Sequence, residues 1–202
     1  MSRPRLSFAA AMAAVFAAAT GCAPAAPAAP AAAAASKKIP PVQHLDLERY
    51  MGHWYVIASI PTRFERGAHN PVETYRLQPD GTVCTSFRFR PGRFDAPVKM
   101  IKSVASAPPT GGPGEWRVHL LGVLRLQYIV GWIAPDYSQV LVVRDKRDHA
   151  WLMARTPTIG AGDYRAMLAR LAAWGYDVSQ VEKAPQRWPE PAAPGAFEVA
   201  CD

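Results

Sequence analysis

The sequence contains none of the short motifs that carry the common enzyme chemistries. Its 202 residues include no Gly-x-Ser-x-Gly segment, no glycine-rich phosphate-binding loop, no Cys-x-x-Cys pair and no two histidines at metal-ligand spacing. All five histidines are isolated, and an isolated histidine is more often structural or exposed than a ligand. We therefore expect a protein that is not an enzyme and that has no catalytic residue, cofactor or metal site.

The sequence also lacks any run or helix rich in lysine and arginine. Lysine and arginine number 23 against 16 aspartates and glutamates, but these basic residues are scattered singly among the predicted strands and loops. Nucleic-acid-binding proteins concentrate positive charge on one face or helix, so we expect no nucleic-acid partner. Half of the residues are hydrophobic, which suffices for the core of one domain.

No long apolar run is present except residues 6–19, which are too few to span a membrane comfortably and follow two arginines, as in a secretory signal. The run ends in Ala19-Thr20-Gly21-Cys22, which resembles the bacterial lipobox, with Ala19 in place of the usual Leu. This resemblance implies a lipoprotein signal peptide at residues 1–21 and lipidation of Cys22. It also implies an anchor in the outer membrane, facing the periplasm. The alternative is an ordinary signal peptide that is cut further along the chain.

Residues 22–38 are rich in alanine and proline. Proline favours an extended chain, so at roughly 3.1 Å per residue this segment spans about 50 Å. We expect a tether here, then a folded domain at residues 39–188 and a flexible tail at residues 189–202. Lipidation would leave two cysteines, Cys84 and Cys201, and an even pair in an oxidising compartment favours a disulfide over two free thiols.

From residue 39 onward, short β-rich runs alternate with turn residues, and one amphipathic helix is predicted at residues 161–174. No helix lies between any two runs, which excludes a parallel βαβ sheet. Eight consecutive antiparallel strands can close into a barrel that holds a small ligand, and a two-sheet sandwich is the alternative. The predicted strands are 54–60, 71–78, 82–90, 97–106, 115–121, 127–134, 139–144 and 149–155.

Three elements then occur in order along the chain: Gly52-His53-Trp54, Asp136-Tyr137 and Arg155. The set resembles the Gly-x-Trp, Thr-Asp-Tyr and arginine motifs of the lipocalin family, with Pro135 in place of the usual Thr. The bacterial outer-membrane lipoprotein and apolipoprotein D branch is the most similar. The resemblance covers about residues 45–188. It implies an all-β fold, an eight-stranded antiparallel up-and-down barrel with one C-terminal α-helix.

Strand order predicts a closed end for such a barrel. The start of the first strand and the end of the eighth lie at the same end, which places Trp54 beside Arg155, where a guanidinium can lie over an indole. The loop that carries Asp136 and Tyr137 falls at this end too, and Gly52 permits close approach of the chain. We expect these five residues to close the barrel and to have no chemical role.

Four loops are predicted at the opposite, open end: residues 63–66, 90–95, 121–126 and 144–148. They carry eight positive and four negative side chains and several leucines. Any one of them is typical of a solvated turn. Together they favour an entrance for an amphiphile with an acidic head.

Alternation along the strands assigns apolar side chains to the barrel interior, where each one either contacts a ligand or fills the core. We therefore predict binding of a fatty acid, a lysophospholipid or a similar amphiphile. A lipocalin-fold enzyme acting on a lipid and a protein-interaction barrel without a ligand are the alternatives, and the sequence leaves the oligomeric state open. The predicted ligand-binding residues are Val56, Ala58, Phe87, Phe89, Val118, Tyr128, Val130, Trp132, Trp151 and Met153.

Overall fold

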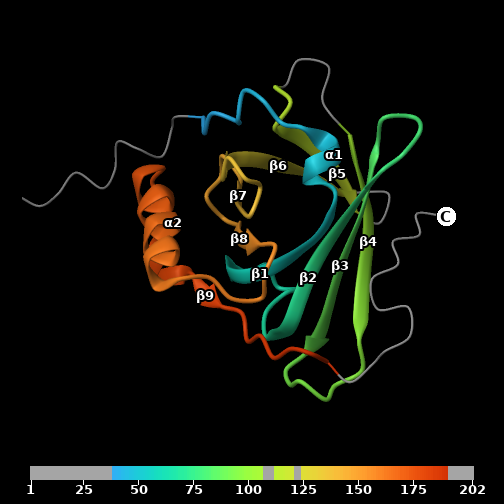
Figure 1. Cartoon of the computed structure of the whole chain (residues 1–202), viewed down its shortest axis with the longest axis vertical. Coiled ribbons are helices and arrows are strands. Elements are labelled where there is room, and N and C mark those ends of the chain that lie inside the picture. The colour runs from blue at the N-terminus through green and yellow to red at the C-terminus, as the bar shows by residue number, and fades with distance from the viewer. Residues whose placement is uncertain (1–37, 107–111, 121–123, 191–202) are drawn as a thin grey trace, which may run out of the picture. The chain divides into compact units, whose positions relative to one another are not determined.

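Eight strands follow one another from Gly52 to Ala154, and each matches one of the predicted β-rich runs (Figure 1). The computed structural model describes residues 38–106, 112–120 and 124–190, all within one unit at residues 31–202. Cys22 and Cys201 lie outside the described residues. The strands are β1 (Gly52–Ile60), β2 (Ala68–Leu77), β3 (Val83–Pro91), β4 (Lys99–Ser106), β5 (Glu115–Leu120), β6 (Leu124–Ile133), β7 (Gln139–Val143) and β8 (Ala150–Ala154).

The strands form a closed barrel. Each strand pairs antiparallel with the next, and β1 pairs with both β2 and β8. The closing pairs run from Gly52 opposite Tyr75 to Tyr55 opposite Val72 on one side, and from Tyr55 opposite Ala154 on the other. Closure joins the two edges that an open sheet would expose. The predicted barrel is therefore confirmed, and the sandwich alternative is wrong.

Two irregularities in the strands reverse which side chains face inward. The pairing of β1 with β8 shifts between Val56 and Ala58, and that of β6 with β7 shifts between Val130 and Trp132. A β-bulge adds one residue to a strand, so every later side chain changes face. Val56 and Val130 belong to the inner core, whereas Ala58 and Trp132 pack in a second core outside the barrel. The prediction that Ala58 and Trp132 line the interior is wrong.

The outer core lies under helix α2 (Ala161–Ala173), which corresponds to the predicted helix and covers the side of β7, β8 and β1 (Figure 1). Its apolar face buries Met167 and Leu171 completely. After the helix, the Trp174 ring lies against Gly131, where an added Cβ would come within 3.0 Å of the ring. A larger residue at 131 would crowd the Trp174 ring and Val143, so glycine suits the close packing here.

The segment before β1 runs along the barrel from its open end to its closed end. The Ile39 amide donates to Asp145 Oδ1 (2.8 Å) in the loop between β7 and β8, and the Val42 amide donates to the Val130 carbonyl (2.9 Å). A short helix, α1 (Leu47–Tyr50), then crosses the closed end, with Asp46 as its N-cap. These contacts hold the chain against the barrel from Ile39 onward.

The closed end is built around Trp54, which is fully buried. The Arg155 guanidinium lies 3.8 Å from the centre of the indole ring and donates hydrogen bonds to three backbone carbonyls, those of Arg49, Tyr50 and His53. Gly52 has a φ of +89°, a conformation that side chains rarely adopt, and a Cβ there would lie 3.5 Å from Arg155 Nη1. Strand order and one glycine therefore bring these residues together.

The loop between β6 and β7 completes the closed end. The Tyr137 hydroxyl accepts a hydrogen bond from the Asp46 amide (2.8 Å), and the Arg49 guanidinium lies over the Tyr137 ring. Asp136 accepts from the amide and the hydroxyl of Ser138, which stabilises the turn. Asp136 and Tyr137 thus hold α1 against the barrel and lie at the end where the sequence placed them.

The chain beyond α2 stays against the barrel further than predicted. After a 3₁₀ turn, η1 (Val178–Gln180), strand β9 (Glu182–Lys183) pairs with β1. Glu190 then bonds to Arg88 and Arg90 on the outer face of β3 and to Asn70 (2.7 Å). Burial opposes ionisation of Glu190, but these hydrogen bonds outweigh it and lower its pKa to about 2. The predicted tail at residues 189–202 therefore starts too early, since Glu190 belongs to the domain.

Within residues 38–106, 112–120 and 124–190, no helix is both long and apolar enough to cross a membrane. In the same part of the chain, no three histidine, cysteine, aspartate or glutamate side chains gather as metal ligands would.

Candidate functional site

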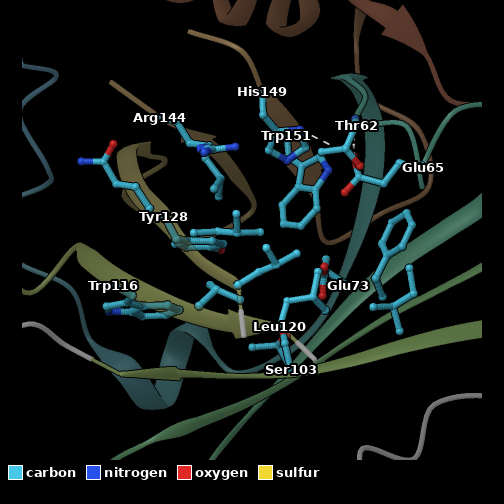
Figure 2. A pocket seen from close by; sticks show the side chains of 18 of the residues that line it. Thr62, Glu65, Glu73, Ser103, Trp116, Leu120, Tyr128, Arg144, His149 and Trp151 are labelled. Atoms are coloured by element: carbon cyan, nitrogen blue, oxygen red, sulfur yellow. Dashed lines mark hydrogen bonds and ion pairs between the residues drawn. The ribbon is translucent and has the colours of Figure 1, made fainter. Parts of the chain in front are cut away.

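A cavity of about 190 Å³ opens between the loops at the open end of the barrel (Figure 2). A single water needs roughly 10–15 Å³ of such space, so the cavity is large enough for part of an organic ligand. Its walls are mostly apolar and aromatic, as is usual in small-molecule sites. The apolar and aromatic residues that line it, besides Phe64 at the mouth, are Tyr75, Phe87, Ile101, Trp116, Val118, Leu120, Leu124, Leu126, Tyr128, Val142 and Trp151.

The predicted ligand-binding residues fall into three groups. Phe87, Val118, Tyr128 and Trp151 line this cavity. Phe89, Val130 and Met153 are buried in the inner core without lining it, and Val56 borders a smaller hollow of about 170 Å³ beside it. Ala58 and Trp132 lie in the outer core, for the reason given above. No ligand is present in the structure, so a contact between any of these residues and a ligand stays a prediction.

Two loops and the start of β6 form the mouth. Thr62, Phe64 and Glu65 come from the β1–β2 loop, and Arg144 and His149 from the β7–β8 loop. Phe64 and Leu124 are 47% and 42% exposed, although large apolar side chains usually avoid water. The apolar stretch at residues 121–126, predicted to be a loop, is partly strand, since β6 begins at Leu124. Leu124 and Leu126 are explained by the cavity, because both line it.

The charge at the mouth is smaller than the sequence predicts. The β3–β4 loop contributes no cavity-lining residue: Arg90 turns to Glu190, and Arg93 pairs with Asp95 at the surface. Arg144 does line the cavity, with its Nη1 3.4 Å from Asp148 and its buried Nε without a hydrogen-bond partner among the described residues. The mouth therefore offers one inward guanidinium donor rather than a ring of positive charge.

His149 and Glu65 lie next to each other at the mouth. His149 Nδ1 lies 2.8 Å from the Ile60 carbonyl and 3.5 Å from Glu65 Oε2. Because a carbonyl can only accept, Nδ1 carries the proton. Glu65 Oε2 also accepts from the Thr62 amide (2.9 Å) and so fixes the loop that carries Phe64. These contacts join the β7–β8 loop to the β1–β2 loop and hold both in place at the entrance.

Three tyrosines form a chain of hydroxyls on the closed-end side of the cavity. The Tyr128 hydroxyl lies 2.5 Å from that of Tyr50 and donates to that of Tyr75 (2.7 Å). Burial raises the pKa of all three phenols, so they stay neutral. On the neighbouring strands β3 and β4, the Thr85 and Ser103 hydroxyls bond to each other (2.7 Å). These hydroxyls satisfy one another and add no charge to the walls.

Glu73 is the feature of the cavity that the sequence analysis missed. Its side chain extends from β2 into the cavity and is only 3% exposed. Burial raises its pKa well above the ordinary value of 4.5, and the charge of Glu65 adds to the effect. The signal was present, since alternation along residues 71–78 puts Glu73 and Tyr75 on one face. No inner face was assigned to that strand, and Trp116 was missed in the same way.

Comparisons with known proteins agree with this architecture. A family model described as a lipocalin-like domain matches residues 45–186. The chain is 30% identical to temperature-induced lipocalin-1 of Arabidopsis thaliana, over 74% of this chain and 84% of that protein. It is 34% identical to the outer membrane lipoprotein Blc of Escherichia coli K12, over 69% and 78% of the two chains.

Solved structures show the same fold at low sequence identity. Insecticyanin from the tobacco hornworm Manduca sexta superposes with a TM-score of 0.57 and 15% identity, over 81% of this chain and 89% of that one. At this identity the likeness concerns the barrel alone.

Proposed function

The chain belongs to the lipocalin family, and on that premise we propose that it binds a fatty acid, lysophospholipid or similar amphiphile in its cavity. One observation carries the proposal: the walls are apolar, and the mouth holds Arg144, whose buried Nε has no partner among the described residues. A buried donor without a partner is costly, and a carboxylate or phosphate would satisfy it with a charge-assisted hydrogen bond. In this arrangement the acyl chain lies in the barrel and its acidic head lies at Arg144.

We also propose that the protein works at a membrane surface, anchored through a lipid on Cys22 in the outer membrane and facing the periplasm. The lipobox-like sequence supports the anchor, and relatives named outer membrane lipoproteins support the location. Phe64 and Leu124, both exposed at the mouth, are suited to contact lipid during loading. The protein then stores or transports its ligand and catalyses no reaction.

Solvent extraction of the purified protein, followed by mass spectrometry, tests for a bound amphiphile. Calorimetric titration with palmitate then tests the site. Val118→Phe fills the cavity and should weaken binding at least about tenfold, whereas Leu77→Phe makes a matched change on the outer surface and should leave it unaltered. An extract without lipid, together with no binding of palmitate, would contradict the proposal.

The role of Arg144 has its own test. Arg144→Met should weaken palmitate binding by roughly tenfold or more and leave the binding of methyl palmitate nearly unchanged, because a charged hydrogen bond is lost only with the acid. Arg66→Met is the control, since Arg66 is an exposed arginine in a mouth loop and does not line the cavity. Equal loss for the acid and its ester would show that Arg144 does not bind the head.

A further inference from the structure

Among the described residues that line the cavity, only Glu73 and Arg144 have a buried side-chain polar atom without a partner. Glu73 Oε2 is buried and makes no hydrogen bond among the described residues. The neighbouring hydroxyls are paired, Thr85 with Ser103 and Tyr128 with Tyr75. Buried polar atoms are nearly always hydrogen-bonded, so an orphan that faces a cavity points to a ligand atom.

The chemistry of that ligand atom follows from the protonation state of Glu73. A carboxylate in apolar surroundings would be very unfavourable, and the nearby negative charge of Glu65 makes it more so. The group is therefore a neutral acid, with one O–H donor and further acceptor capacity. A plain hydrocarbon chain leaves both unsatisfied, whereas an alcohol can donate to and accept from the same carboxyl. Arg144 at the mouth already suits the acidic head, so the second polar group belongs on the chain.

We propose that Glu73 is a binding residue for a hydroxyl group carried on the ligand's acyl chain, so that the cavity selects hydroxylated amphiphiles over plain ones. This inference rests on the proposed function, because it takes the ligand's acidic head to lie at the mouth. It adds a chemical class to the ligand that the apolar walls alone do not specify. The apolar walls provide the affinity for an acyl chain, and Glu73 makes the cavity prefer a hydroxylated chain to a plain one.

The test compares palmitate with three hydroxylated palmitates that carry the hydroxyl near the carboxylate, at mid-chain or at the terminal carbon. The wild-type protein should bind at least one of the three about fivefold more tightly than palmitate, as expected for one net hydrogen bond to a buried group. Glu73→Gln keeps a donor and an acceptor and should retain the preference. Glu73→Met keeps a similar shape without hydrogen bonding, so it should lose the preference and bind palmitate at least as well as the wild type.

Thr85→Val serves as a control, because it removes a cavity hydroxyl that already has a partner and should leave the preference in place. Thermal melting of each variant verifies that it is folded before titration. Equal affinities of the wild type for all four acids would overturn the inference, as would an unchanged preference in the Met variant or tighter binding of hexadecylamine than of any hydroxylated acid. Failure of all four acids to bind would instead refute the proposed function.

Discussion

Removal of the Arg155 side chain should destabilise the barrel without weakening ligand binding. Arg155→Ala deletes the guanidinium that covers Trp54 at 3.8 Å and that donates to the carbonyls of Arg49 (2.6 Å), Tyr50 (3.1 Å) and His53 (2.8 Å). These contacts join the start of β1, the end of α1 and the residue after β8. The cavity opens at the other end of the barrel, so its walls keep their positions.

The magnitude follows from which contacts water can replace. The carbonyls of Arg49 and His53 are bonded at the exposed side of Arg155, so water takes over much of their bonding when the side chain is removed. The cation–π contact is worth about 1 kcal/mol at a half-buried site. The bond to the partly buried Tyr50 carbonyl adds about 1.5 kcal/mol as a charged hydrogen bond. We therefore expect a loss of about 2–3 kcal/mol, which lowers the melting temperature by roughly 4–12 °C for a domain of this size.

Thermal unfolding followed by circular dichroism measures this loss, and calorimetric titration with palmitate measures binding to the folded variant. Arg165→Ala is a matched control, because Arg165 is exposed on α2 and its loss should shift the melting temperature very little. Arg155→Lys keeps the charge but not the planar fork and should fall between the two. A melting curve that coincides with that of the wild type would refute the reasoning. Abolished binding with intact melting would mean that Arg155 lies near the ligand.

Three further predictions concern the anchor, the cysteines and the C-terminal segment. Cys22→Ser should release the protein from the membrane fraction with its melting temperature unchanged; unchanged membrane association would rule out lipidation as the anchor. Thiol titration of the mature, unreduced protein should find no reactive thiol if Cys84 and Cys201 are bonded, and two titratable thiols would end the disulfide prediction. Because the pKa of Glu190 is lowered to about 2, its pairing with Arg88 is fully present above pH 4.5 and is lost as pH falls towards 2. Glu190→Gln should therefore flatten the pH dependence of the unfolding free energy in that range, and an unaltered profile would contradict the assignment.

The strands, the helix and the closed end could be predicted because local signals determine them. Alternating apolar residues and turn residues mark eight strands, and the antiparallel order then brings Trp54 to Arg155 without further information. The bulges could not be predicted in this way. One extra residue in β1 or β6 leaves the composition of the strand unchanged, yet it moves Ala58 and Trp132 to the outer core.

The rest of the site depends on contacts between distant parts of the chain. Alternation puts Glu73 on the same strand face as Tyr75, but a glutamate on a strand is ordinarily solvated. Its burial and its neutral state therefore follow only from the surrounding barrel. Glu190 lies in a Pro/Ala-rich segment whose composition predicts a loose tail. Its pairing with Arg88 and Arg90, on the outer face of β3, could be recognised only after folding.

The Ile39 amide is bonded to Asp145 at the open end of the barrel, so an anchor on Cys22 would hold the barrel by that end. The chain enters the domain at the mouth and not at the closed end, so a lipid on Cys22 would keep the entrance within about 50 Å of the bilayer. Because a tether of that length joins the barrel to the membrane, contact between the entrance and the bilayer is an intramolecular event. The effective concentration of the entrance at the membrane is then in the millimolar range. Exchange of ligand would then depend little on how many copies of the protein the compartment contains.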